Sequence, residues 1–248
     1  MDSTLYLQGA VSGIFGLTIS YPCDTIKTNL QAGKPIKYNF RFLYTGFKGP
    51  LCGIFLEKGM VFGTFNNIKK QLNGTFSNPI IINAVSGGIS GIAASVVVTP
   101  YERYKILLQT HDNKVSNKEL FNPRKMFKGF SATLAREPLG YAIYFTTYET
   151  IKHKIYNGTY TLTGSFFGGG ISGAIAWCFI CPIDVVKTRV QSQIGNTLTI
   201  KQIIKEIHLE YGIRGFFKGL LPALLRAMTL HAGTFAMMEF LDQQKKKL

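Results

Sequence analysis

Charged residues stand inside otherwise apolar segments of this chain, where an ionisable group is costly unless it faces a polar cavity. Four of them have chemistry suited to holding a ligand: Glu57, Arg136, Glu137 and Arg226. An arginine offers forked donors for a carboxylate, and a glutamate can hold a cationic amine. Together they complement a zwitterion with an extra positive group. The alternative is that Arg136 and Glu137, as neighbours, only neutralise each other.

No arrangement for catalysis accompanies these charges. The four histidines are isolated along the sequence: His111, His153, His208 and His231. Cys178 and Cys181 have the spacing of a redox or metal pair, but they end an apolar stretch and have no second pair. We interpret them as small packing residues. The sequence contains no metal cluster, nucleophile triad or phosphate loop, so it predicts a protein that is not an enzyme and uses no metal or cofactor.

Three long stretches without a charged residue alternate with the charged segments. They are residues 3–23, 71–101 and 155–183. A helix that crosses the ~30 Å hydrocarbon core of a bilayer needs about 20 mostly apolar residues, so each stretch is long enough to span a membrane. Polar stretches between them explain why the mean hydropathy is only +0.12.

The segments that carry the charges form a second set of predicted helices, over residues 49–69, 131–152 and 220–242. Because charged groups in a membrane must face a polar space, we expect six tilted helices around a central, water-filled site. The net charge of +15 fits either a surface facing anionic lipid headgroups or a pathway that attracts anions. Nucleic-acid binding is disfavoured, because the basic residues are dispersed.

One charged motif ends each uncharged stretch: a proline, an acid two residues later, a lysine at five and a glutamine at nine. The copies are Pro22, Asp24, Lys27 and Gln31; Pro100, Glu102, Lys105 and Gln109; and Pro182, Asp184, Lys187 and Gln191. A second pattern, a glycine followed 19 residues on by a large side chain, begins at Gly46, Gly129 and Gly219. Two motifs with one period predict three repeats, over residues 1–74, 75–157 and 158–248. Each proline is expected to kink its helix.

Two further patterns concern packing. Glycines four residues apart in the uncharged helices would let helices approach closely, although membrane helices are also rich in glycine generally. The pairs are Gly9 and Gly13, Gly87 and Gly91, and Gly169 and Gly173. Isoleucines at 200, 203, 204 and 207 predict a short amphipathic surface helix, whereas residues 31–46 leave little room for one.

Over essentially its whole length, the chain resembles the mitochondrial carrier family, on the three copies of the proline motif. The resemblance implies an all-α membrane protein with six transmembrane helices in three pseudo-threefold repeats and short amphipathic matrix-side helices. It also implies a place in the mitochondrial inner membrane. The chain departs from the family in its shorter repeats. It also keeps a basic residue at the seventh position only as Arg189, against Asn29 and Leu107.

The resemblance further implies two gates. On the matrix side, the motif charges would pair as Lys27–Glu102, Lys105–Asp184 and Lys187–Asp24, braced by Gln31, Gln109 and Gln191. Exposed ion pairs are individually weak, so a ring of three can hold a gate shut and still open. On the cytoplasmic side, the pairs would be Lys69–Glu149 and Lys152–Glu239, with Asp242 and Asn66 at the third position. Because that third pair is not ionic, we expect the weaker gate there.

Family members read their substrate at equivalent points of the second helix of each repeat. Those points correspond here to Gly53, Arg136 and Arg226, with Glu57 one turn beyond Gly53 and Glu137 beside Arg136. The set resembles carriers of ornithine and other basic amino acids. Carnitine or acylcarnitine, S-adenosylmethionine and nucleotides remain open as substrates, and so does a non-transporting scaffold on the same fold. We expect exchange by alternating access, in a monomer that contacts cardiolipin.

Overall fold

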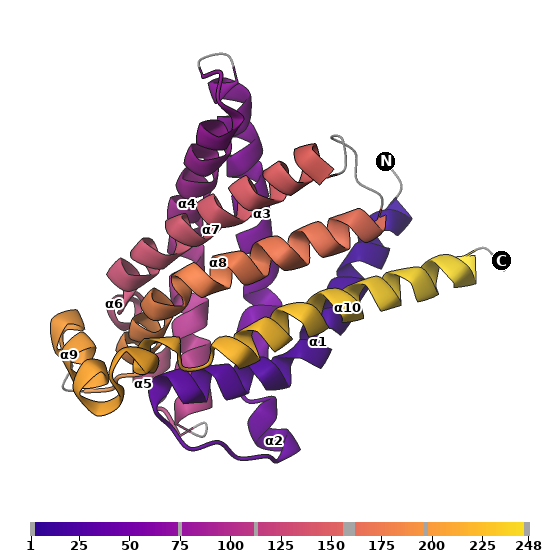
Figure 1. Cartoon of the computed structure of the whole chain (residues 1–248). Helices are drawn as coiled ribbons and strands as arrows, with labels where there is room; N and C mark the ends of the chain where they lie inside the picture. Colours follow the sequence, from indigo (N-terminus) through magenta and orange to yellow (C-terminus); the bar gives the residue numbers. More distant parts are fainter. Residues whose placement is uncertain (1–2, 74–75, 112–113, 156–161, 196–197, 246–248) are drawn as a thin grey trace.

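The computed structural model describes residues 3–73, 76–111, 114–155, 162–195 and 198–245, and every regular element in them is a helix (Figure 1). The six long helices are α1 (Ser3–Ala32), α3 (Lys48–Leu72), α4 (Pro79–Thr110), α7 (Phe130–Ile155), α8 (Leu162–Gln191) and α10 (Leu220–Lys245). Shorter ones are α2 (Phe40–Leu43), α5 (Asn117–Leu120), α6 (Pro123–Met126), α9 (Ile200–Tyr211) and the 3-10 helix η1 (Ile213–Phe217). The prediction of an all-α chain is confirmed.

The predicted helix boundaries agree closely with the structure. Helices α3, α7 and α10 each begin within one residue of the prediction and continue three residues beyond it. Within the residues that the structure describes, two segments are long and apolar enough to cross a membrane, Pro79–Thr110 and Phe167–Gln191. Helices α3, α7 and α10 carry charged side chains that lower their hydropathy, so six spans remain an expectation from the pattern.

Each motif proline stands inside its helix and not at its end. Pro22, Pro100 and Pro182 are followed by further helix as far as Ala32, Thr110 and Gln191. The motif acid, lysine and glutamine therefore project from a helical segment that continues past the proline. The kink itself stays a prediction.

The long helices pack in the order α3, α4, α7, α8, α10 and α1, and the helices with the motif prolines, α1, α4 and α8, also meet one another. In Figure 1 the helices converge toward the end of the bundle beside α9 and diverge toward the chain termini and the α3–α4 turn. We call the converging end the closed end.

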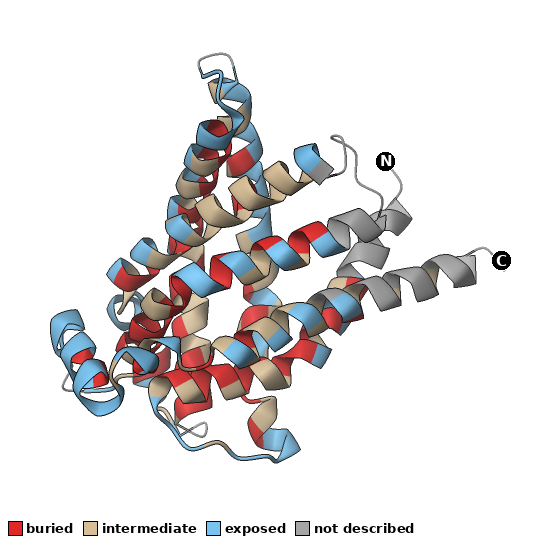
Figure 2. Cartoon of the chain, viewed as in Figure 1, coloured by how far each residue is buried: buried red, intermediate tan, exposed pale blue. Residues whose placement is uncertain are grey.

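The distribution of polarity is the reverse of that in a water-soluble bundle. Large apolar side chains are exposed on the outer faces, as with Ile92 and Val96 of α4 and Phe179 of α8, which is 63% exposed. In contrast, Arg103 and Lys187 are each 1% exposed. Figure 2 shows buried residues gathered where the helices converge. Exposed apolar surface on this scale fits contact with lipid.

The glycine spacing has different consequences in different helices. A Cβ on Gly87 would lie 2.6 Å from the Tyr141 carbonyl oxygen, and one on Gly91 would lie 2.5 Å from the Pro138 backbone, so α4 and α7 touch through these glycines. Among the described residues, Gly13 and Gly173 have nothing within 4 Å. The surroundings of Gly9 lie outside the described part of the chain. The predicted close approach is therefore confirmed for the α4 pair and stays a prediction for the other glycines.

Helix α9 confirms the predicted amphipathic helix. Ile203 and Ile207 are buried against a cluster that includes Val190 of α8, while Ile204 is exposed. Thr199 and Gln202 form a capping box at its start. The first repeat has only the four residues of α2 in the equivalent place, as its short connection predicts.

The α4–α7 contact gives a test with a neighbouring control. We expect Gly91→Ala to destabilise the purified protein by about 1–3 kcal/mol, because the added methyl group meets backbone that cannot move aside. Gly88→Ala, three residues earlier with open space around it, should leave the melting temperature unchanged or slightly higher. Equal melting temperatures for the two variants would contradict the close contact.

Candidate functional site

Three ion pairs close a ring among α1, α4 and α8 at the closed end. The Nζ atom of Lys27 lies 2.6 Å from Asp184, Lys105 pairs with Asp24, and Lys187 pairs with Glu102. All six motif charges therefore meet, as the resemblance implies. We call this set the ion-pair ring.

The predicted partners within the ring are wrong. Lys27 pairs with Asp184 and not Glu102, Lys105 with Asp24 and not Asp184, and Lys187 with Glu102 and not Asp24. A lysine three residues after an acid lies about 60° around the helix from it, so the two face different neighbours. Which neighbour each one meets depends on the order of the helices around the ring, and the motif does not contain that order.

The motif glutamines differ in what they hold. Gln31 donates to Asp184 over 2.8 Å, so it braces the Lys27–Asp184 pair as predicted. Gln109 instead donates to the hydroxyls of Tyr21 and Thr25 on α1, and Gln191 donates to Thr133 on α7. The expectation that all three brace ion pairs is therefore wrong. Nearby hydroxyl groups take the amide donors of the other two, which still join neighbouring helices.

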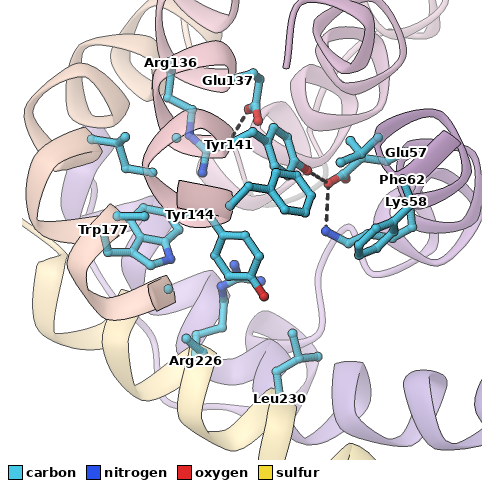
Figure 3. A pocket seen from close by; sticks show the side chains of 17 residues that line it. Glu57, Lys58, Phe62, Arg136, Glu137, Tyr141, Tyr144, Trp177, Arg226 and Leu230 are labelled. Atoms are coloured by element: carbon cyan, nitrogen blue, oxygen red, sulfur yellow. Dashed lines mark hydrogen bonds and ion pairs between the residues drawn. The ribbon is translucent and has the colours of Figure 1, made fainter. Parts of the chain in front are cut away.

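A cavity of about 330 Å³ lies among α3, α7, α8 and α10 (Figure 3). Its polar and aromatic lining includes Glu57, Lys58, Arg136, Tyr141, Trp177 and Arg226. This volume lies at the lower end of the range for small-molecule sites. Four of the five predicted binding residues line it: Glu57, Arg136, Glu137 and Arg226.

Gly53 is the predicted binding residue that does not line this cavity. A Cβ there would lie 2.4 Å from the ring of Tyr101, so the glycine makes room for that ring. Gly53 instead lines a separate groove between α3 and α4. Its connection to the cavity is indirect, because the Tyr101 hydroxyl donates to Glu57.

Glu57 is held by two tyrosines and a lysine. Tyr141 donates to its Oε1 atom over 2.6 Å, Tyr101 donates to Oε2, and the Lys58 Nζ atom lies 3.2 Å from Oε1. Figure 3 shows Tyr141 and Lys58 directed at this carboxylate. Sequence reasoning missed both tyrosines, since a tyrosine in an apolar helix carries no signal of its partner.

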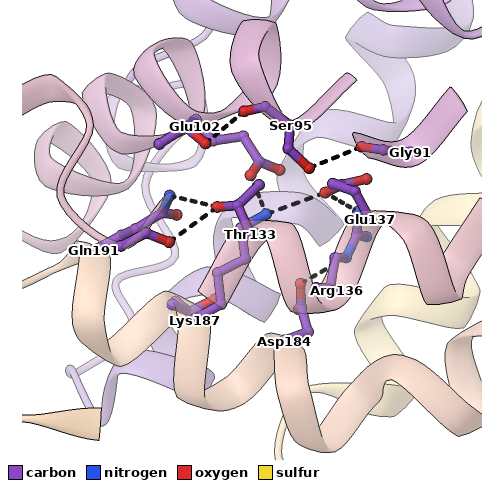
Figure 4. A network of polar contacts seen from close by, with 12 residues as sticks. Gly91, Ser95, Glu102, Thr133, Arg136, Glu137, Asp184, Lys187 and Gln191 are labelled. Carbon is purple, nitrogen blue, oxygen red and sulfur yellow. Dashed lines mark hydrogen bonds and ion pairs between the residues drawn. The ribbon is translucent and has the colours of Figure 1, made fainter. Parts of the chain in front are cut away.

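The arginines of the cavity also reach the ion-pair ring. Arg136 pairs with Glu137 and places its Nε atom 3.4 Å from Asp184 (Figure 4). Glu137 in turn lies 3.4 Å from Lys187. Arg226 places its Nε atom 3.5 Å from Asp24. Arg136 and Glu137 therefore neutralise each other in part, but each also contacts a charge of the ion-pair ring and so connects the cavity to the ring.

Trp177 of α8 is a cavity residue that sequence reasoning missed. Its ring centroid lies 4.3 Å from the Lys27 ammonium, 5.2 Å from the Arg136 guanidinium and 6.0 Å from that of Arg226. The face of an indole attracts cations at such distances. It is the only tryptophan of the sequence and stands in an uncharged stretch, and that is the one compositional signal that points to it.

At the diverging end, Lys69 of α3 lies 3.0 Å from Glu149 of α7, so this predicted pair forms. The predicted partner of Lys152 is Glu239, whose side chain lies outside the described residues, as does that of Asp242. The pairs that involve these two residues therefore stay predictions.

A buried arginine next to the motif acid was also missed. Arg103 of α4 donates to Glu119 of α5 over 2.7 Å and to the Gln191 carbonyl oxygen over 3.1 Å. In the third repeat Arg189 lies 3.6 Å from Glu210 of α9. Arg189 holds the seventh position of the motif in the third repeat, and Leu107 holds it in the second. Leu107 cannot form an ion pair, and Arg103, one helical turn before it, forms one instead.

The ring partners can be tested by exchanging charges. Lys27→Asp should destabilise the protein by about 3–5 kcal/mol, because Asp184 loses the nearer of its two cations and gains a like charge. Adding Asp184→Lys should recover much of that loss in thermal unfolding. As the comparison, Lys27→Glu with Glu102→Lys exchanges charges that are not partners and should show no recovery. Recovery by that second combination would support the originally predicted partners instead.

The Glu119 link predicts a pH dependence. Burial acts to raise the pKa of the Glu119 carboxyl, but the hydrogen bond and charge of Lys125 and the charge of Arg103 outweigh it, so the pKa lies below its ordinary value. A lowered carboxyl pKa adds stability above the ordinary value of about 4.5, and this stability is lost as the pH falls through the folded-state pKa.

We therefore expect Glu119→Gln to lower the melting temperature at pH 7, and the difference from the unmodified protein to shrink below about pH 4.5. Glu206→Gln provides the control, because its partner Arg189 is 3.8 Å away and its side chain is half exposed. It should change stability by less than about 1 kcal/mol at either pH. A pH-independent effect of Glu119→Gln would show that its charge is not involved.

Comparison with known proteins gives the family. A model described as "Mitochondrial carrier protein" matches residues 76–159 and 158–247. The chain is 30% identical to mitochondrial substrate carrier family protein S of Dictyostelium discoideum, over 94% of each chain. It is 29% identical to mitochondrial magnesium exporter 1 of Drosophila melanogaster, over 93% of this chain and 90% of that protein. It is 28% identical to mitochondrial ornithine transporter 1 of Saccharomyces cerevisiae, over 95% and 94%. With its three repeated motifs and the charges they bring together, the chain belongs to the mitochondrial carrier family.

Proposed function

We propose that this carrier exchanges basic amino acids, such as ornithine, lysine or arginine, across the mitochondrial inner membrane by alternating access. The observation that supports this most is the separation of charge in the cavity. Glu57 projects from α3, whereas Arg136 and Arg226 project from α7 and α10 beside Trp177 (Figure 3). A substrate with a carboxylate at one end and an amine at the other matches both sides.

The two arginines suit the carboxylate end. A guanidinium presents planar, forked donors, and both arginines line the cavity while their Nε atoms lie 3.4 Å from Asp184 and 3.5 Å from Asp24. Glu57 suits the distal amine, because its carboxylate is positioned by Tyr101 and Tyr141. The α-amine of the substrate has Glu137 within the same cavity.

The contacts between cavity and ring suggest how binding opens the gate. Arg136 and Arg226 lie near the ring acids Asp184 and Asp24, so a substrate carboxylate competes with those acids. A substrate amine at Glu137 likewise competes with Lys187. Binding thus draws charge away from the ring, and the free energy of binding offsets the cost of separating its ion pairs.

The relatives do not decide the substrate. Proteins of nearly equal identity to this chain bear names for different cargo, ornithine in one case and magnesium in another. The choice therefore rests on the residues of the cavity. Carnitine or acylcarnitine is the second candidate. It also has a carboxylate and a fixed cation, but its cation cannot donate the hydrogen bonds that Glu57 would accept.

The same proposal includes the membrane in which the protein lies and the side that each gate faces. We place its six long helices across the inner membrane, with the ion-pair ring as the matrix gate and Lys69–Glu149 as part of the cytoplasmic gate. The exposed apolar faces and the net charge of +15 support contact with an anionic lipid such as cardiolipin. We expect the carrier to work as a monomer.

Exchange by the purified protein in liposomes tests the substrate. Liposomes loaded with ornithine should take up labelled ornithine, lysine or arginine, and much less carnitine, nucleotide or magnesium ion. Arg226→Ala should reduce uptake about tenfold or more, since truncating a charged contact costs about 1.5–3 kcal/mol. Carnitine uptake without amino-acid uptake would favour the second candidate, and no exchange of any solute would favour a scaffold.

A further inference from the structure

Lys58 is a cation inside the site that the binding scheme does not use. It lines the cavity, follows Glu57 directly on α3, and places its Nζ atom 3.2 Å from the Glu57 carboxylate. The same ammonium lies 5.8 Å from the centroid of the Tyr141 ring. A substrate amine bound at Glu57 would need this position beside the carboxylate and the aromatic ring.

The Glu57 carboxylate has little capacity left for another donor. Its two oxygens offer about four lone-pair positions. The Tyr101 and Tyr141 hydroxyls and the Lys58 ammonium already occupy three of them. A second ammonium at the remaining position would lie beside Lys58 and be repelled by its like charge.

Of the three partners, Lys58 is the one that can leave. Tyr101 and Tyr141 join the packed cluster around Val61 and Phe145, and Gly53 lies under the Tyr101 ring. The Lys58 side chain is 50% exposed, against 14% for Glu57. Its flexible stem allows the ammonium to turn into the aqueous cavity without exposing a buried surface.

We propose that Lys58 is a specificity residue: it is a built-in competitor that occupies the Glu57 subsite until the distal cation of the substrate displaces it. The inference rests on the proposed function and refines it. In the empty carrier, Lys58 neutralises a mostly buried carboxylate. During exchange, a cationic substrate must break this ion pair, and release is helped when Lys58 returns.

The competition has a consequence for selectivity. A basic amino acid gains the contact with Glu57 but loses the Lys58–Glu57 pair, so its advantage over a neutral amino acid is reduced. A substrate with the same carbon skeleton but no terminal amine leaves the pair intact. Lys58 therefore lowers the affinity for basic substrates and leaves that for neutral ones unchanged.

Substrate affinities of the unmodified carrier and of Lys58→Gln in ornithine-loaded liposomes test this. We expect the KM for ornithine to fall about two- to fivefold, the range for losing one partly exposed ion pair. Inhibition by norvaline, which is ornithine without its terminal amine, should stay the same. Lys58→Arg keeps the competing charge and should keep the original KM. Lys70→Gln, an exposed lysine on the same helix outside the cavity, controls for the change in net charge.

Two further variants keep the test decisive. Lys58→Met removes the charge with similar length if the glutamine variant does not fold. Glu57→Gln should abolish the effect of Lys58→Gln on KM, because no carboxylate remains to compete for. An unchanged or raised KM for ornithine in both Lys58→Gln and Lys58→Met would overturn the role of Lys58 alone. Failure of the unmodified carrier to exchange any amino acid would overturn the proposed function, and this inference with it.

Discussion

This structure depends on ion pairs between charged side chains at the closed end, where burial makes an unpaired charge costly. Six motif charges meet where α1, α4 and α8 converge, and most of them are nearly inaccessible to water. Removing one partner of such a pair costs about 3–5 kcal/mol, because the other charge stays buried without compensation. The helices must therefore stay together at this end unless another charge takes the place of a departing partner.

Two of the proposed binding residues, Arg136 and Arg226, lie near enough to the ring acids to take that place. Asp24 has both Lys105 and Arg226 beside it, and Asp184 has both Lys27 and Arg136. A ring acid with two cations can lose one without being left unpaired. Because each arginine belongs to the cavity as well as to the ring, a ligand that binds the arginines alters the balance of the ring. Cavity and ring therefore form one electrostatic network.

The sequence predicted the parts of this network that depend on spacing along a helix. Motif spacing placed six charges at one level of three helices, and the interrupted apolar segments placed Glu57, Arg136, Glu137 and Arg226 at the cavity. The partners depend on how helices are ordered and turned in space, and spacing does not contain that information. The ion pairs were predicted in the wrong direction for this reason. Gly53 was misplaced similarly: one turn from Glu57 is near in sequence, yet Gly53 packs against Tyr101 on α4.

The three interfaces among α1, α4 and α8 are not equivalent, because they differ in the number of charged side chains that join them. Besides the ion pairs, Arg103 of α4 donates to the Gln191 carbonyl of α8, and Arg189 of α8 donates to the Gln31 carbonyl of α1. The equivalent hydrogen bond from α1 to α4 would need a long cationic side chain at position 29. Asn29 is too short to reach, and its amide bonds to Thr25 of its own helix. The α1–α4 interface therefore relies on Lys105–Asp24 and on the neutral bonds of Gln109. With one fewer charged clamp than the α4–α8 and α8–α1 interfaces, it is the interface where separation disturbs the fewest buried charges.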